Sequence, residues 1–184
     1  MKNGKRILKV VVKRMVDYNP DTSWLGEYSN KVKSAYTIDR NHDSDCPRFW
    51  ANDDVPDDAR ECDCSPVGSR ELDYFEPPHE NYKGEPEVEI RRYCLQDYNR
   101  MESLNRGEWC FMGIGAEAEI QSGSDVVQRI RSGGLFGIES DMAANDIQAV
   151  EKDQLSELRQ ELRSIGFSTR AISKAFENVQ HAES

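Results

Sequence analysis

The fold of this chain is decided by EWCFMGIGAEAEIQ, residues 108–121. The side chains of this stretch alternate between two faces, and one face is entirely apolar: Cys110, Met112, Ile114, Ala116, Ala118 and Ile120. The other face carries two aromatic residues, two glycines and two acids: Trp109, Phe111, Gly113, Gly115, Glu117 and Glu119. A period of two with one apolar face predicts a long strand that buries one side.

Three further strands are expected around this one. Gly123-Ser124-Asp125 is a turn sequence, so residues 126–130 should return as a short partner in a hairpin. Residues 5–16, KRILKVVVKRMV, are rich in β-branched side chains and predict a strand that shares a sheet with 108–130. Residues 33–40 also alternate and predict a further strand.

Helical spacing marks two regions. Residues 87–105 carry one apolar stripe: Ile90, Cys94, Leu95, Tyr98, Met101 and Leu104. The tail carries another, Ile147, Val150, Leu155, Leu158, Leu162 and Ile165, and after Gly166 a second short helix should begin at Ser168. We expect the apolar face of 108–121 to pack on the helix 87–105.

These elements predict an α+β fold. The expected architecture is a mainly antiparallel four-stranded sheet covered by about three helices, with an irregular acidic insertion at about 41–88 and C-terminal helices at about 143–181. Only 37% of the residues are apolar, against roughly 45–50% (with glycine) in a typical domain. We therefore expect one core and a single domain, residues 1–184.

The segment DYNPDTSWLGEYS, residues 17–29, is dense in turn-forming residues. It nevertheless contains Trp24 and Leu25, two large apolar side chains. We expect a compact turn that buries Trp24 in the core.

Charge is distributed unevenly along the chain. Residues 41–90 hold 15 acidic and 4 basic side chains, a net charge of −11, whereas residues 1–40 carry +5 and residues 91–184 carry −4. Such acidity argues against a general nucleic-acid binder, although the basic N-terminal segment could touch phosphate. It favours a protein partner with a basic surface, bound by the acidic candidates Asp53, Asp54, Asp57, Asp58, Glu61 and Asp63. The sequence leaves open the alternative that the acidic segment only keeps the protein soluble.

The apolar runs and the cysteines of the sequence indicate where in the cell the protein is expected. No apolar run approaches the roughly 18 residues that cross a bilayer, and no signal-peptide pattern is present. The 5 cysteines form an odd set with irregular spacing, which favours free thiols. We expect a soluble cytoplasmic protein without membrane contact; its oligomeric state is open.

The residues most suited to binding a metal are His42, Cys46, Cys62, Cys64 and His79. Zinc favours four thiolate or imidazole ligands, and His42-x3-Cys46 has a plausible spacing, but Cys62-x-Cys64 is tighter than the usual pair. The sequence therefore predicts no metal and no cofactor. It leaves open whether His42 binds zinc together with the three cysteines.

Motifs for catalysis are weak. The glycine-rich stretch 132–141 lacks the lysine of a phosphate-binding loop, so a glycine-rich turn is expected there. Glu117 and Glu119 share a strand face and are expected to be solvated. An enzyme would have to use carboxylates near the glycine-rich turn, with Asp17, Asp21, Glu139 and Asp141 as the candidates.

Several segments resemble a family of small hypothetical proteins from bacterial genomes, plasmids and phages. They are DYNPDTSWLGEYS (17–29), DRNHDSDCP (39–47), DYNRMESLNRGEWCFMGIGAEAEI (97–120) and RIRSGGLFGIESD (129–141), followed by LSELRQELRSIGFSTRAISKAFENV. The resemblance omits roughly residues 48–88 and supplies no catalytic residues. It implies an accessory protein carried by mobile elements.

Two functions are therefore expected from different classes. The first is a non-enzymatic inhibitor of the anti-CRISPR or anti-restriction type, whose acidic surface occupies a basic nucleic-acid-binding site of a host complex; no direct contact with nucleic acid is expected. The alternative is a small metal-assisted or acid–base enzyme.

Overall fold

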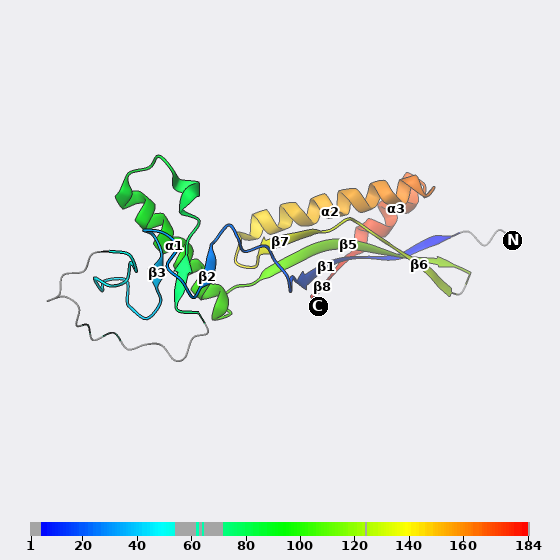
Figure 1. Ribbon diagram of the computed structural model, residues 1–184. Helices are drawn as coiled ribbons and strands as arrows, with labels where there is room; N and C mark the ends of the chain where they lie inside the picture. The colour runs from blue at the N-terminus through cyan, green and yellow to red at the C-terminus, as the bar shows by residue number, and fades with distance from the viewer. Residues whose placement is uncertain (1–4, 54–61, 63, 65–71, 124, 184) are drawn as a thin grey trace. The chain divides into compact units, whose positions relative to one another are not determined.

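The computed structural model describes residues 5–53, 62, 64, 72–123 and 125–183 (Figure 1). The chain divides into two compact units. Unit 1 combines Met1–Pro20 with Trp109–Ser184, and unit 2 is Asp21–Glu108. The expectation of a single domain does not anticipate this division.

Unit 1 is built on a five-stranded mixed sheet (Figure 1). Its strands are β1 (Arg6–Val16), β5 (Phe111–Ser122), β6 (Asp125–Arg131), β7 (Leu135–Glu139) and β8 (Val179–Glu183). The order is β6-β5-β1-β8, and β7 pairs with β5. Strand β5 is antiparallel to β1, β6 and β7, whereas β8 is parallel to β1. The shared sheet for 5–16 and 108–130 is confirmed.

One face of this sheet is covered by α2 (Ala144–Ser164) and α3 (Thr169–Ala175), with the short 3-10 helix η3 (Phe176–Asn178) after them (Figure 1). The largest core cluster joins strand and helix side chains: Val10, Ala116, Ala118, Ile120, Leu158, Leu162, Ile172 and Phe176. A second cluster joins Val12, Met112, Ile114, Ile138 and Ile147. The predicted N-cap of α3 is confirmed, because the Ala171 N–H donates to Ser168 Oγ.

Unit 1 corrects several sequence predictions. The large sheet has five strands rather than four. The expected strand 33–40 contributes to the other sheet, Leu135–Glu139 forms β7 inside the expected glycine-rich turn, and Val179–Glu183 forms β8 where the end of the last helix was expected. The apolar face of β5 packs on α2 and α3, so the expected partner helix 87–105 was wrong. Periodicity identifies an apolar face but does not identify its partner.

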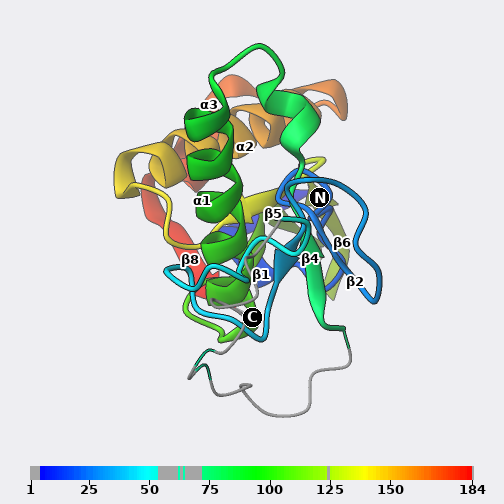
Figure 2. The same cartoon turned by 60° about the vertical axis from the view of Figure 1, so that its left-hand side comes forward.

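Unit 2 holds a three-stranded antiparallel sheet with the order β2-β4-β3. The strands are β2 (Glu27–Ser29), β3 (Ile38–Asp39) and β4 (Tyr74–Glu76), followed by the 3-10 helix η2 (His79–Tyr82) and the helix α1 (Glu87–Asn105). Helix α1 runs beside this sheet, and Tyr98 meets Phe75 of β4 at a ring-centroid distance of 5.4 Å (Figures 1 and 2). The core is small: Leu25, Ile38, Phe49, Phe75, Ile90, Cys94, Tyr98 and Met101.

Unit 2 confirms the bounds of one helix and corrects two other expectations. Residues 87–105 form α1 as predicted. The strand expected over 33–40 shrinks to Ile38–Asp39. Trp24 is 45% exposed, so its expected burial is wrong, whereas its neighbour Leu25 is 1% exposed.

The α+β class is thus confirmed, with three α-helices among the described residues and two sheets. None of the helices in the described ranges has both the length and the apolar character that a bilayer crossing demands.

Candidate metal centre

A series of tight turns in unit 2 positions the first two candidate ligands. The N–H of His42 donates to the carbonyl of Asp39 at 3.2 Å, and the N–H of Cys46 donates to the carbonyl of Asp43 at 2.9 Å. A third turn closes where the Phe49 N–H meets the Cys46 carbonyl at 3.0 Å. The sequence supports these turns with aspartates and with Pro47, residues that favour them.

The turn segment is anchored to the core by its aromatic residues. Phe49 is 2% exposed, and its carbonyl accepts a hydrogen bond from the Asp39 N–H of β3 at 2.8 Å. Its ring meets Tyr98 of α1 at a centroid distance of 5.9 Å. The backbone that carries His42 and Cys46 is therefore fixed by β3 and α1.

Four potential metal ligands converge beside these turns. One ligand atom each from His42, Cys46, Cys62 and Cys64 lies within 4.8 Å of the other three. Nδ1 of His42 is 3.6 Å from the sulfur of Cys46 and 3.3 Å from that of Cys62. In a tetrahedral zinc site with Zn–S bonds of about 2.3 Å and a Zn–N bond of about 2.0 Å, ligand atoms lie about 3.5–3.8 Å apart. The two distances from Nδ1 of His42 are close to this spacing, whereas the 4.8 Å bound on the whole set is wider, so the cluster has the ligand types of a Cys3His zinc site at somewhat looser spacing.

A carboxylate lies near the ring nitrogen of His42 that does not face the thiols. Nε2 of His42 faces Oδ2 of Asp39 at 3.7 Å, while Nδ1 points to the thiols. The His42 side chain is 8% exposed. Metal-binding histidines commonly direct their second ring nitrogen to a carboxylate, which fixes the tautomer and makes the metal-facing nitrogen more basic.

The thiols share hydrogen bonds. The Cys64 N–H donates to the sulfur of Cys62 and lowers the pKa of the Cys62 thiol. At Cys64 the N–H of Asp43 acts in the same direction, but partial burial and hydrogen bonds to the sulfurs of Cys46 and Cys62 outweigh it and raise the pKa to about 11. Three adjacent thiols repel one another as thiolates, and a divalent cation removes that repulsion.

The unusual Cys62-x-Cys64 spacing does not prevent convergence. One ligand atom each from Cys62 and Cys64 lies within 4.8 Å of those of His42 and Cys46. The fifth candidate, His79, lies outside the cluster. Its Nδ1 is 3.3 Å from Oε1 of Glu76, and its ring packs against Tyr36 at a centroid distance of 5.0 Å.

Of the six acidic binding candidates, only Asp53 falls within the described residues; Asp54, Asp57, Asp58, Glu61 and Asp63 lie outside them. Asp53 makes a two-pronged ion pair with Arg91 of α1, at 2.6 and 2.8 Å. These hydrogen bonds from Arg91 lower the pKa of Asp53. Asp53 is therefore a structural anchor of the acidic segment.

The carboxylates named for an enzyme serve local structure where their contacts are resolved. Asp17 accepts backbone hydrogen bonds from Asn19 at 3.1 Å and from Gly137 at 3.2 Å. Asp21 accepts one from the Ser23 N–H at 2.9 Å. Asp21 belongs to unit 2 and Asp17 to unit 1.

Comparison of the chain with protein-family models, with curated proteins and with solved structures finds no match. All four ligands of the cluster are among the metal candidates that the sequence offers, although the tight Cys62-x-Cys64 spacing argues against the set on sequence grounds.

Proposed function

We propose that this protein is a non-enzymatic binding protein in which a zinc ion held by His42, Cys46, Cys62 and Cys64 supports an acidic recognition surface. The observation that carries the proposal is the convergence of these four side chains within 4.8 Å. The partner is a basic, nucleic-acid-binding site of a host complex, and inhibition of a defence system on behalf of a mobile element is the biological role.

The number of ligands supports a structural metal. Structural zinc sites are closed by four protein ligands, whereas catalytic ones keep a position for water or substrate. One histidine and three cysteines complete the shell of a tetrahedral ion. The metal then supplies folding energy rather than chemistry.

The position of the ligands supports the acidic segment as the recognition surface. Residues 47–61 lie between Cys46 and Cys62 and contain 5 acidic and 2 basic side chains. A metal bound to both cysteines closes this segment into a loop and restricts its conformations, which reduces the entropy lost on binding.

The net charge of residues 41–90 still favours a basic partner after metal binding. Zinc and three thiolates sum to −1, so the ion does not neutralise the −11 of residues 41–90. Clustered carboxylates steer a protein onto surfaces rich in lysine and arginine that otherwise bind phosphate. A reducing, cytoplasmic compartment is part of the proposal because the ligand thiols must stay reduced.

The test begins with the metal. The purified full-length chain should contain one zinc per molecule by elemental analysis, and His42→Ala, Cys46→Ser and Cys62→Ser should each lower that content. His79→Ala is the matched control and should retain the metal. A wild-type chain that takes up no zinc under reducing conditions would refute the metal centre.

Binding is tested with three acidic candidates that lie outside the described residues. An Asp54→Asn/Asp57→Asn/Asp58→Asn variant keeps Asp53 and its pair with Arg91. It should lose capture of a basic host complex, and wild-type capture should weaken as salt rises past about 0.15 M, where the Debye length is near 8 Å. The control neutralises three exposed acids of unit 1, Asp153, Glu161 and Glu177. Equal capture by both variants would contradict the proposal.

A further inference from the structure

The face of the large sheet opposite the one that packs on α2 and α3 carries a group of basic side chains. Residues paired across strands share a face, and Lys9 of β1 lies opposite Glu119 of β5, which lies opposite Arg129 of β6. The cations of this face are Arg6, Lys9, Lys13, Arg129 and Arg131. We call these five residues the basic face.

Two acids lie among the cations of the basic face. Glu119 is 3.3 Å from both Lys9 and Arg129. Glu117 is 3.1 Å from Lys13, 2.7 Å from Arg131 and 3.7 Å from Arg129. Among the described residues of this group, five cations against two carboxylates leave a local surplus of three positive charges; Glu139, paired with Phe111, lies farther along the same face.

The excess positive charge of the basic face is accessible to a ligand. The side chains of Arg129 and Arg131 are 55% and 66% exposed, whereas that of Glu117 is 5% exposed. The carboxylates therefore lie beneath the guanidinium groups and hold them in place. Arg131 uses its Nε on Glu117, and a guanidinium has further N–H donors.

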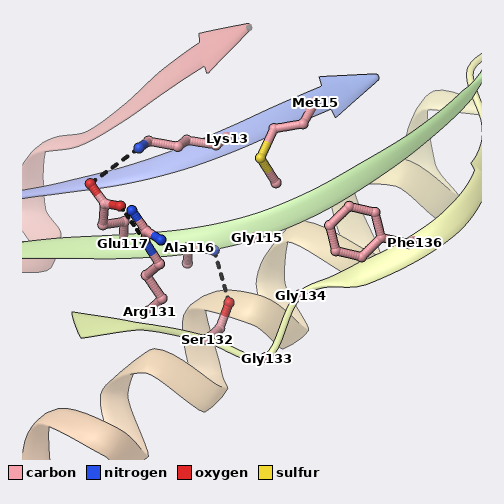
Figure 3. A pocket seen from close by; sticks show the side chains of 10 residues that line it. All are labelled: Lys13, Met15, Gly115, Ala116, Glu117, Arg131, Ser132, Gly133, Gly134 and Phe136. Carbon is pink, nitrogen blue, oxygen red and sulfur yellow. Dashed lines mark hydrogen bonds and ion pairs between the residues drawn. The ribbon is translucent and has the colours of Figure 1, made fainter. Parts of the chain in front are cut away.

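A cavity of about 310 Å³ opens next to these cations (Figure 3). Its lining includes Lys13 and Arg131 with their shared partner Glu117, and the apolar side chains of Met15 and Phe136. Its floor is Gly115, and Phe136 covers the neighbouring Gly113, where a Cβ would come within 2.4 Å of the ring. Phe136 itself is 55% exposed. The cavity thus combines an aromatic ring, a side-chain-free floor and two cations.

We propose that the basic face binds single-stranded nucleic acid, with one base in the cavity against Phe136 and the backbone phosphates on the cations. Single-strand binding sites combine a basic track with an aromatic platform for bases. A strand fits better than an isolated nucleotide because the cations continue from the cavity along β1 and β6, where alternate residues stand about 7 Å apart.

The net charge of −10 does not oppose this proposal. At physiological salt, charges separated by more than about 8 Å are largely screened, so the local surplus governs the contact. The acidity of the sequence argues against a general nucleic-acid binder, but composition alone does not show which basic residues share a face. This inference uses residues of unit 1 only and is independent of the proposed function.

The first test measures fluorescence anisotropy of a labelled oligo(dT) of about 12 nucleotides with the full-length chain in low salt. Binding should be detectable, and contacts to about three phosphates should weaken it about 20-fold between 50 and 200 mM salt. Unlabelled thymidine monophosphate should compete far less well than the unlabelled strand. No binding in low salt, or equal competition by the mononucleotide, would overturn the proposal.

Variants locate the site. Gly115→Ala should narrow the cavity without strain, because its Cβ would meet its nearest neighbours at 3.8 Å. It should weaken oligonucleotide binding while keeping the thermal stability of the wild type. Phe136→Ala should lose at least about fivefold in affinity through lost stacking. Unchanged affinity in both variants would contradict the cavity assignment.

The charge test replaces two other cations, so that the ion pairs of Lys13 and Arg131 with Glu117 remain. An Arg6→Gln/Arg129→Gln variant should weaken binding and flatten its salt dependence. The matched control is Lys152→Gln/Arg163→Gln on the exposed side of α2, with the same change in net charge. Equal weakening by the two pairs would show general electrostatic attraction and overturn the site. Zinc chelation and the Asp54/Asp57/Asp58 variant should leave oligonucleotide binding intact.

Discussion

The burial and the pKa of Glu117 are set by the side chains around it. The expectation of a solvated sheet face is wrong for this side chain, because the residue is 4% exposed and contacts Lys13 and Arg131. Burial acts to raise the pKa of Glu117, but the hydrogen bonds from Arg131 and Lys13 outweigh it and lower the pKa. The ionised form is therefore the one that the folded state favours.

The lowered pKa of Glu117 predicts that its contribution to stability is lost at acidic pH. A carboxyl group with a lowered pKa stabilises the fold above its ordinary value of 4.5 and loses that contribution as pH falls through the lower folded value. Glu117→Gln should be less stable than wild type at pH 7, and the difference should shrink below about pH 4.5. Urea unfolding across pH 3–7 measures this, and a pH-independent difference would contradict the ion pairs.

A second residue-scale prediction compares two neighbours, Trp24 and Leu25. Leu25 is 1% exposed and Trp24 is 45% exposed. Leu25→Ala should cost about 2–5 kcal/mol of unfolding free energy, as buried truncations do. Trp24→Ala should cost clearly less, although tryptophan is larger. Chemical denaturation of the two variants measures both unfolding free energies. A larger decrease for Trp24→Ala than for Leu25→Ala would contradict the observed burial.

At the scale of elements, the amphipathic helices and the long strands follow from local periodicity. Helix α1 has the predicted bounds, and β1 and β5 lie where alternation places them. The missed strands β7 and β8 have five residues each. They are short, and their strand character depends on pairing with β5 and β1, which are distant in sequence.

The pairing of β5 with α2 is testable. Leu158 of α2 is fully buried against the sheet, so Leu158→Ala should lower the unfolding free energy by about 2–5 kcal/mol. Gln160, two residues further along, is exposed, and Gln160→Ala should change it by no more than about 0.5 kcal/mol. Equal effects in thermal denaturation would contradict the assigned helix face.

At the scale of the whole molecule, unit 2 interrupts unit 1 in sequence between Pro20 and Trp109. Its described core consists of a few, partly aromatic side chains around Phe75 and Tyr98. Small cores commonly need a staple such as a metal or a disulfide, and the five cysteines are free thiols. The zinc centre would supply that staple.

Two units predict two unfolding events. Removing zinc from the full-length chain with a strong chelator should lower the melting temperature of the unit 2 transition in calorimetry and leave the unit 1 transition in place. Leu158→Ala should do the reverse and serves as the matched comparison. A single transition that both perturbations shift equally would contradict two separate cores.

The sequence by itself determined the α+β class, the long strands and helices, and the concentration of acid in residues 41–90, because these depend on spacing and composition along the chain. Tertiary structure decided which helix covers β5, which cations share a face with Glu117, and that Cys62 and Cys64 meet His42 and Cys46. Those relations join residues far apart in sequence. Only folding brings them within contact distance, and local patterns carry no information about it.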